Sequence, residues 1–346
     1  MKHLGVLLLG VLAVVATFLV GGGVITHATP DPVALNTNAA TDSGADQRPQ
    51  LTTDGAGNWV AVWESDDDLG ATIETDSDIL VARSSDDGAT WTAPAALNTD
   101  AAADGVGDFF PQVATDGVGN WVAIWARDVI LVARSVNNGA TWTAPATLGD
   151  APAFDLFPQV TTDGAGNWVA VWASGTLTCL SGSLSCDIQV SRSTDNGVNW
   201  TTPDLLASGL SGLPQVTTDA GDWVAVWQSG DTLGNTIGPD ADILTARSTD
   251  AGVNWTAPAA LNTNAATDSG NDVKPQVSTD GAGDWVAVWE SDDDLGATIG
   301  TDQDILFSRS TNAGVDWAAP AALNTNAATD SGDDGGPPLP TPTALR

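Results

Sequence analysis

One unit of sequence occurs five times after residue 30, and this repetition restricts the chain to few architectures. Each unit begins with a Pro-Gln pair, and its last tryptophan stands at position 91, 142, 200, 255 or 317. The resulting spacings of 51, 58, 55 and 62 residues suit one four-stranded blade each. We therefore expect an all-β fold, a β-propeller of four-stranded blades with five repeats. A solenoid or a sandwich agrees less well with this spacing.

Four short segments of the first unit have the composition of β-strands, at residues 50–53, 59–64, 78–83 and 94–98. The first two are joined by a Gly-containing stretch, and glycine readily takes the positive φ of a tight hairpin. The second segment, Trp-Val-Ala-Val-Trp, is apolar on both faces. This pattern indicates a strand that is buried between neighbouring blades.

An eight-residue motif, Ser-Ser-Asp-Asp-Gly-Ala-Thr-Trp, joins the third and fourth segments, and it resembles the Asp-box (BNR) motif of the sialidase superfamily. Its counterparts occur in all five units. The motif residues are Ser84, Asp86, Gly88, Trp91, Ser135, Asn137, Gly139, Trp142, Ser193, Asp195, Gly197, Trp200, Ser248, Asp250, Gly252, Trp255, Ser310, Asn312, Gly314 and Trp317. An Asp or Asn side chain in such a turn can accept backbone N–H bonds. The resemblance implies that these boxes are structural turns and lie away from any active site.

The resemblance also implies six blades, whereas five full units are present. Residues 33–36 and 320–324 are both copies of the fourth strand, and one of them could complete a blade. A five-bladed ring is the first interpretation, and a truncated six-bladed propeller is the alternative.

Enzymes of the sialidase family typically hold the substrate carboxylate with three arginines, use a Tyr paired with a Glu as nucleophile, and use an Asp as acid/base. This chain contains no Tyr. We therefore expect a divergent, non-catalytic member of the superfamily. An exo-α-sialidase-like glycoside hydrolase that uses other carboxylates is the alternative.

Alternating connections place the loops between second and third strands, together with the blade-to-blade loops, on the face opposite the boxes. Binding residues on rigid scaffolds tend to lie on such loops. The acidic stretch of residues 66–78 returns at 292–304, and clustered carboxylates can bind calcium, although acidic turns also occur without metal. No cofactor is required. The candidate calcium ligands are Asp66, Asp68, Asp76, Asp78, Asp292, Asp294, Asp302 and Asp304.

Few basic residues are free to bind a ligand. Five arginines precede the boxes at equivalent positions, which indicates a repeated structural role, and Arg346 is terminal. Arg48, Arg127 and Lys274 remain, all at strand ends on the loop face. We take them as candidates for holding an anionic ligand group, with ion pairing to neighbouring Asp as the alternative.

The net charge of −34 makes nucleic acid and anionic membrane surfaces poor partners. Residues 1–28 have the pattern of a signal peptide or membrane anchor, residues 31–330 form the predicted propeller, and residues 331–346 form a Gly/Pro-rich tail. Cys179 and Cys186 are predicted to form a disulfide in an oxidising compartment. The sequence thus predicts a secreted or cell-surface protein.

The predicted function is that of a non-catalytic module that binds a glycan or an extracellular protein, or mediates adhesion. Besides the glycoside hydrolase, a structural repeat-array surface protein is a further alternative, favoured if the Pro-rich tail is a linker into more sequence. The sequence does not identify the ligand.

Overall fold

A computed structural model describes residues 34–42, 44–149, 154–175, 186–329 and 331–335. All regular elements in these ranges are β-strands, which confirms the predicted all-β class. No helix able to cross a membrane occurs within them. The expected signal segment and Cys179 lie outside these ranges, so the export signal and the disulfide to the buried Cys186 stay predictions.

Three of the repeats form separate four-stranded antiparallel sheets, in which the strands pair in chain order. The first sheet contains β1 (Asp46–Thr53), β2 (Trp59–Ser65), β3 (Asp78–Ser84) and β4 (Ala95–Ala96). The second contains β5 (Phe109–Thr115), β6 (Trp121–Ala126), β7 (Ile130–Ser135) and β8 (Ala146–Thr147). The fifth repeat contains β16 (Asp272–Thr279), β17 (Trp285–Ser291), β18 (Asp304–Ser310) and β19 (Ala321–Ala322). The fourth strands are shorter than predicted.

The third and fourth repeats share one seven-stranded sheet. Its strands are β9 (Phe154–Thr162), β10 (Trp168–Gly175), β11 (Cys186–Ser193), β12 (Asp204–Asp219), β13 (Asp222–Ser229), β14 (Asp242–Ser248) and β15 (Ala259–Ala260). Strand β12 is the last strand of the third repeat and continues as the first strand of the fourth. The reason is local: this junction is the shortest of the four, with 13 residues between Trp200 and Pro214.

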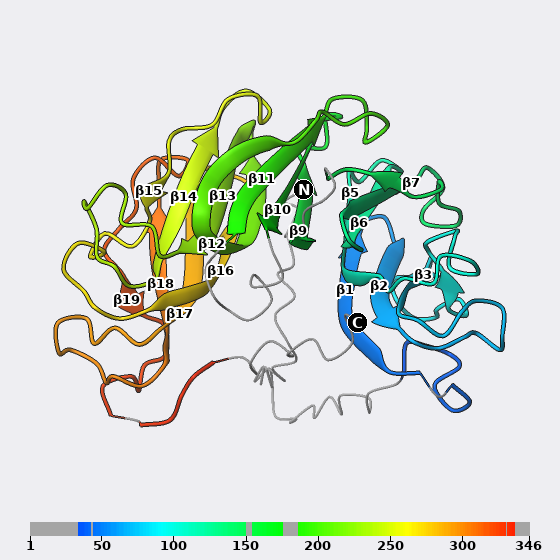
Figure 1. Ribbon diagram of the computed structural model, residues 1–346, viewed down its shortest axis with the longest axis horizontal. Helices are drawn as coiled ribbons and strands as arrows, with labels where there is room; N and C mark the ends of the chain where they lie inside the picture. Colours follow the sequence, from blue (N-terminus) through cyan, green and yellow to red (C-terminus); the bar gives the residue numbers. More distant parts are fainter. Residues whose placement is uncertain (1–33, 43, 150–153, 176–185, 330, 336–346) are drawn as a thin grey trace, which may run out of the picture.

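The first strands of successive repeats pack side by side, in the order β1, β5, β9, β12 and β16 (Figure 1). The sheets therefore follow one another around a common centre, which is the arrangement of a β-propeller. Among the described residues, no comparable packing joins β16 back to β1.

The two kinds of connection lie on opposite faces. Asp87 N donates to Gly57 O at 3.1 Å, which ties a box turn to the β1–β2 turn of the same repeat, and Asn196 does the same with Gly166 at 3.1 Å. On the other face, Glu74 N in the β2–β3 loop donates to Ala101 O in the following blade-to-blade loop at 3.0 Å. The predicted placement of the acidic loops opposite the boxes agrees with these contacts.

The box turns have the geometry that their residue types favour. Asp86 Oδ1 accepts a bond from Thr90 N at 2.9 Å, and Asn137 Oδ1 accepts the equivalent bond from Thr141 N at 3.0 Å. Gly88 has a φ of 80°, in the left-handed region that favours glycine. Hydrogen bonding to Ser84 and Thr90 lowers the pKa of Asp86 to about 2.

Equivalent apolar residues are buried between each pair of neighbouring repeats. Val60, Val62, Ile79 and Leu97 of the first repeat pack against Trp121 and Trp125 of the second, and all are fully buried. Two arginines also form hydrogen bonds between neighbouring repeats. Arg134 Nε donates to Asn196 O in the next box at 2.6 Å, and Arg247 Nε donates to Ala313 O at 2.6 Å.

The fifth repeat leaves this interface uncovered. Val286 is 41% exposed, whereas its counterparts Val60, Val122, Val169 and Val224 are all 0% exposed. Leu323 is 55% exposed, whereas Leu97 and Leu261 are 0% exposed. We call Val286, Val288, Ile305, Phe307 and Leu323 the open face.

Candidate functional site

Each innermost strand carries an irregularity just before its Pro-Gln pair. The residue preceding the proline has a positive φ in all five repeats: Arg48 (49°), Phe110 (54°), Phe157 (54°), Leu213 (48°) and Lys274 (53°). The strand register shifts at the same places. Such a conformation costs roughly 1–3 kcal/mol for a residue other than glycine, and bulges redirect side chains. We call these five residues the bulge ring.

Three members of the bulge ring contact one another across repeats. The guanidinium carbon of Arg48 lies 4.3 Å from the centroid of the Phe110 ring. The Phe110 ring in turn meets the Phe157 ring edge-on, with centroids 4.6 Å apart. All three side chains are half-buried. An aromatic surface flanked by a cation therefore lies where adjacent innermost strands meet.

Each cation of the bulge ring is paired with a glutamate of its own repeat. Arg48 forms an ion pair with Glu64, whose Oε1 also accepts a bond from Phe110 N. Burial raises the pKa of Glu64, although its bonds to Phe110 and Arg48 oppose this shift. Lys274 Nζ lies 2.8 Å from Glu290 Oε2. The predicted ligand-binding residues Arg48 and Lys274 thus occur as neutral pairs with both donors and acceptors.

Arg127 lies outside the bulge ring. Its Nε donates to Asp108 Oδ1 and its Nη2 to Asp108 Oδ2, both at 2.7 Å. Nη1 donates to Asp100 at 2.9 Å, and Nη2 also donates to Asp104. Three carboxylates therefore surround this guanidinium, as the ion-pairing alternative predicted.

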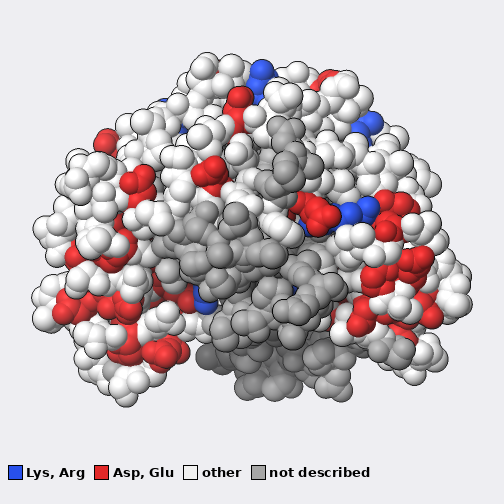
Figure 2. Space-filling view, in the orientation of Figure 1, with Lys and Arg blue, Asp and Glu red and all other residues white. Residues whose placement is uncertain are grey.

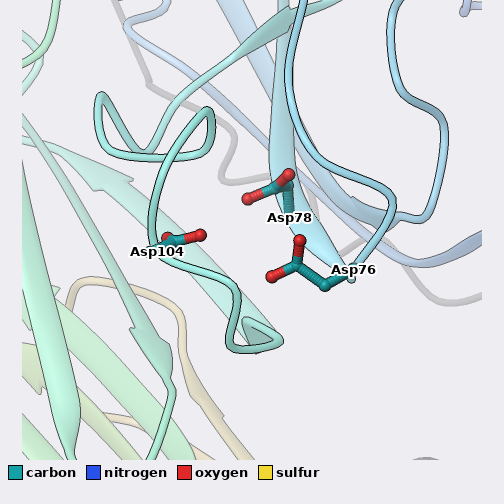
Figure 3. A group of neighbouring side chains, drawn as sticks. All are labelled: Asp76, Asp78 and Asp104. Atoms are coloured by element: carbon teal, nitrogen blue, oxygen red, sulfur yellow. The ribbon is translucent and has the colours of Figure 1, made fainter. Parts of the chain in front are cut away.

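Among the described residues, two groups of carboxylates are close enough to hold a metal ion. The first acidic cluster is Asp76, Asp78 and Asp104, and the second acidic cluster is Asp240, Asp242 and Asp268. In each, one oxygen per residue lies within 4.8 Å of the others. Figure 3 shows Asp78 at the start of β3, Asp76 on the loop just before it and Asp104 on a facing loop, around a common space. In the view of Figure 2, Asp and Glu gather in patches at the left and right of the molecule, and Lys and Arg are sparse.

The two clusters share one local design. Asp78 is fully buried, and its Oδ1 accepts a bond from Asn98 Nδ2 at 2.7 Å, while Oδ2 has no hydrogen-bond partner. Asp242 repeats this arrangement with Asn262, also at 2.7 Å. Burial and the neighbouring carboxylates raise the pKa of each to about 7. The pKa of Asp268 is raised to about 6 by burial and by Asp293 and Asp240.

The structure brings only part of the predicted calcium set together. Asp76 and Asp78 belong to the first acidic cluster, whereas Asp66 accepts a bond from Ala45 N and Asp68 one from Gly70 N. In the fifth repeat, Asp292 and Asp294 likewise accept backbone bonds. Asp304 accepts a bond from Asn324 at 2.6 Å, as Asp78 does from Asn98, and Asp302 stands at the position of Asp76. The third position there, Asp330, lies outside the described ranges.

Sequence reasoning omitted Asp104, Asp240, Asp242 and Asp268 from the ligand set. The signal was present in the register of the repeats. Asp104 and Asp268 each follow an Asn, Asn98 or Asn262, by six residues, and these Asn side chains bind the cluster.

No protein-family model matches the chain, and no curated protein sequence matches it. Among solved structures, a protein of unknown function from Dyadobacter fermentans has a TM-score of 0.51 at 15% identity, covering 82% of this chain and 84% of that one. The Hadza microbial sialidase Hz136 has a TM-score of 0.49 at 19% identity, covering 84% of this chain and 59% of the sialidase. The GH93 α-L-arabinofuranosidase of Fusarium graminearum has a TM-score of 0.46 at 15% identity, covering 64% and 68%. This chain thus spans less than two thirds of the sialidase's length, and at such identities the similarity concerns the fold alone.

Proposed function

We propose that this chain is a non-catalytic binding propeller of the cell exterior, and that its bulge ring binds a glycan. The observation that carries the proposal is the line of Arg48, Phe110 and Phe157 across three repeats, held by left-handed backbone. Binding sites combine apolar or aromatic surface with a few placed polar groups. The Phe rings supply the first, and the Arg48–Glu64 and Lys274–Glu290 pairs supply the second.

A glycan suits this surface better than a simple anion. Both cations are already neutralised by glutamates that are nearly buried, so a lone carboxylate or phosphate would have to compete with them. A sugar offers hydroxyl groups that donate to Glu64 or Glu290 and accept from Arg48 or Lys274, together with an apolar C–H face for the Phe rings. An extracellular protein is the other partner class, and the experiment below distinguishes the two.

The test is a glycan-array screen of the exported protein, followed by titration of any hit against two variants. Phe157→Ala should weaken binding at least about ten-fold, because it removes one aromatic face of the site. Phe307→Ala is the matched control, because it removes a half-buried Phe from the open face. The proposal fails if no glycan binds, which favours a protein partner, or if both variants bind as well as the unmodified chain.

A structural repeat-array role is the second candidate function, and the open face is the observation that favours it. The same face supports the truncated six-bladed interpretation over a closed five-bladed ring, because Val286 would be covered in a closed ring. A surface made of stacked repeats would bury it against a further unit. Analytical ultracentrifugation of the unmodified chain and of Val286→Asp tests this role. A monomer that Val286→Asp leaves unchanged contradicts it.

A further inference from the structure

We infer that the second acidic cluster, Asp240, Asp242 and Asp268, binds one hard divalent cation of the calcium type, and that Arg127 supplies the positive charge at the first acidic cluster. The inference concerns the blade-to-blade junctions and does not depend on glycan binding at the bulge ring. It rests on comparing two junctions that the repeat makes equivalent.

The two junctions correspond residue by residue. Asp76, Asp78, Asn98 and Asp104 in the first match Asp240, Asp242, Asn262 and Asp268 in the second, and Asp108 matches Asp272. The hydrogen bonds agree as well, since Ile79 N and Ile243 N each donate to the corresponding Asn Oδ1 at 3.1 Å. Differences between the junctions are therefore local.

One difference is the residue at the end of the second strand. Asp272 pairs with Ser291 across the fifth sheet, and the equivalent position in the second repeat is Arg127. The Arg127 side chain binds Asp104 and both oxygens of Asp108, so a positive charge already engages these two carboxylates of the junction. A metal ion that took Asp104 as a ligand would lie beside this guanidinium and would be repelled by it.

At the second junction Ser291 supplies no charge. Within the described part of the chain, no Lys or Arg forms an ion pair with Asp240, Asp242, Asp268 or Asp272. Both oxygens of Asp268 are buried without a hydrogen-bond partner. Buried carboxylates are normally paired or coordinate a metal, because an isolated buried charge is costly.

Asp242 is the group that points to a ligand. Asp242 is 0% exposed, and one of its oxygens accepts a hydrogen bond from Asn262. Its other oxygen has no hydrogen-bond partner, and the carboxylate lies close to those of Asp240 and Asp268. Asp272, also fully buried, is close enough to add its charge to the same group. Carboxylates from separate loops, with water completing the shell, match the oxygen-rich coordination of calcium.

The experiment is isothermal titration of calcium chloride into the chelator-treated full chain and three variants. The unmodified chain should bind one equivalent at this junction. Asp268→Asn should abolish that binding or weaken it at least about 100-fold, whereas the matched Asp104→Asn should leave it within about three-fold. Arg127→Gln should gain a second equivalent, because it exposes Asp104 and Asp108 to the ion.

The outcomes separate cleanly. Loss of binding in Asp104→Asn with retention in Asp268→Asn overturns the inference, and so does equal binding at both junctions in the unmodified chain. No binding in any variant also overturns it, while leaving the glycan-array result untouched. If Arg127→Gln does not fold, the pair of Asp→Asn variants decides alone.

Discussion

Gly139 in the second box lies directly against Val60 of the first repeat. A Cβ placed on Gly139 would come within 2.7 Å of Val60 Cγ2, closer than real Cβ contacts. The same approach occurs between Gly197 and Val122, at 2.6 Å, and between Gly314 and Val224, at 2.6 Å. Box glycines therefore serve the contact between repeats as well as the turn itself.

Gly139→Ala should destabilise the chain more than Gly88→Ala. Both glycines have positive φ, so both variants carry the same backbone strain. A Cβ on Gly88 would meet only Trp91, at 4.0 Å, so the clash with a neighbouring repeat is absent. We expect a difference of about 1–3 kcal/mol from overpacking, measured by urea unfolding. Equal losses would show that the turn alone requires glycine.

Asp86→Asn should be nearly neutral, and Asp86→Ala should destabilise the chain, because the turn donors of Thr90 lose their side-chain acceptor. Asn already serves in two boxes: Asn137 Oδ1 accepts from Thr141 N, and Asn312 Oδ1 accepts from Asp316 N, both at 3.0 Å. Chemical denaturation of the two variants at pH 7 measures this. A large loss in Asp86→Asn would mean that the charge itself is needed.

In chelator, the chain should lose stability as pH rises from about 4 to about 8. The folded-state pKa values of Asp242, Asp268 and Asp272 are raised by burial to about 7, 6 and 8, above the value near 3.9 of an unfolded Asp. The stability that these three carboxyl groups add is thus fully present below about pH 4, and it is lost as the pH rises and the buried groups ionise. The lowered pKa of Asp86, about 2, keeps this carboxylate ionised throughout this range.

Calcium should reverse this loss above about pH 7, because an ion that binds only the folded chain stabilises it. Melting temperatures at pH 5 and pH 8, with chelator and with calcium, measure the effect. Asp268→Asn is the control and should show little response to calcium. A melting temperature in chelator that is higher at pH 8 than at pH 5 contradicts the prediction.

The chain should not hydrolyse sialosides. It contains no Tyr to act as the usual nucleophile, and Arg48 and Arg127 are held in ion pairs. The assay uses a fluorogenic sialoside from about pH 4 to 8, the range in which carboxyl acid/base pairs operate. Turnover above a heat-inactivated sample, abolished by Arg48→Ala, would reveal an active site that the residue inventory missed.

Much of the scaffold could be predicted from the sequence because the information is local. Strand β2 follows from the uninterrupted apolar run from Trp59 to Trp63, and the box turns follow from Ser84, Asp86 and Gly88. The merging of two strands into β12 was not predicted, because it depends on how short one junction is. The left-handed conformation of Phe110 and Phe157 has no signal in their residue type and depends on the register of paired strands.

The candidate site was predictable only in part. The sequence shows which loops are acidic, but consecutive residues such as Asp66-Asp67-Asp68 do not form a cluster. The clustered carboxylates come from separate loops. Asp78 meets Asp104 because a hydrogen bond between Glu74 and Ala101 joins the two loops. The role of Arg127 required the three-dimensional comparison of two junctions.

The open face of the fifth repeat affects where the folded chain opens locally. Burying a Val or Leu side chain stabilises the folded state by about 1.5–3 kcal/mol. Val286 and Leu323 contribute less than this because they are partly exposed. In a protein of stacked repeats, stability is close to a sum of neighbour contacts, so a repeat with one neighbour opens most easily. Strands β17 and β18 should therefore exchange their amide hydrogens sooner than β6 and β7, and unfolding should spread from this end of the molecule toward its centre.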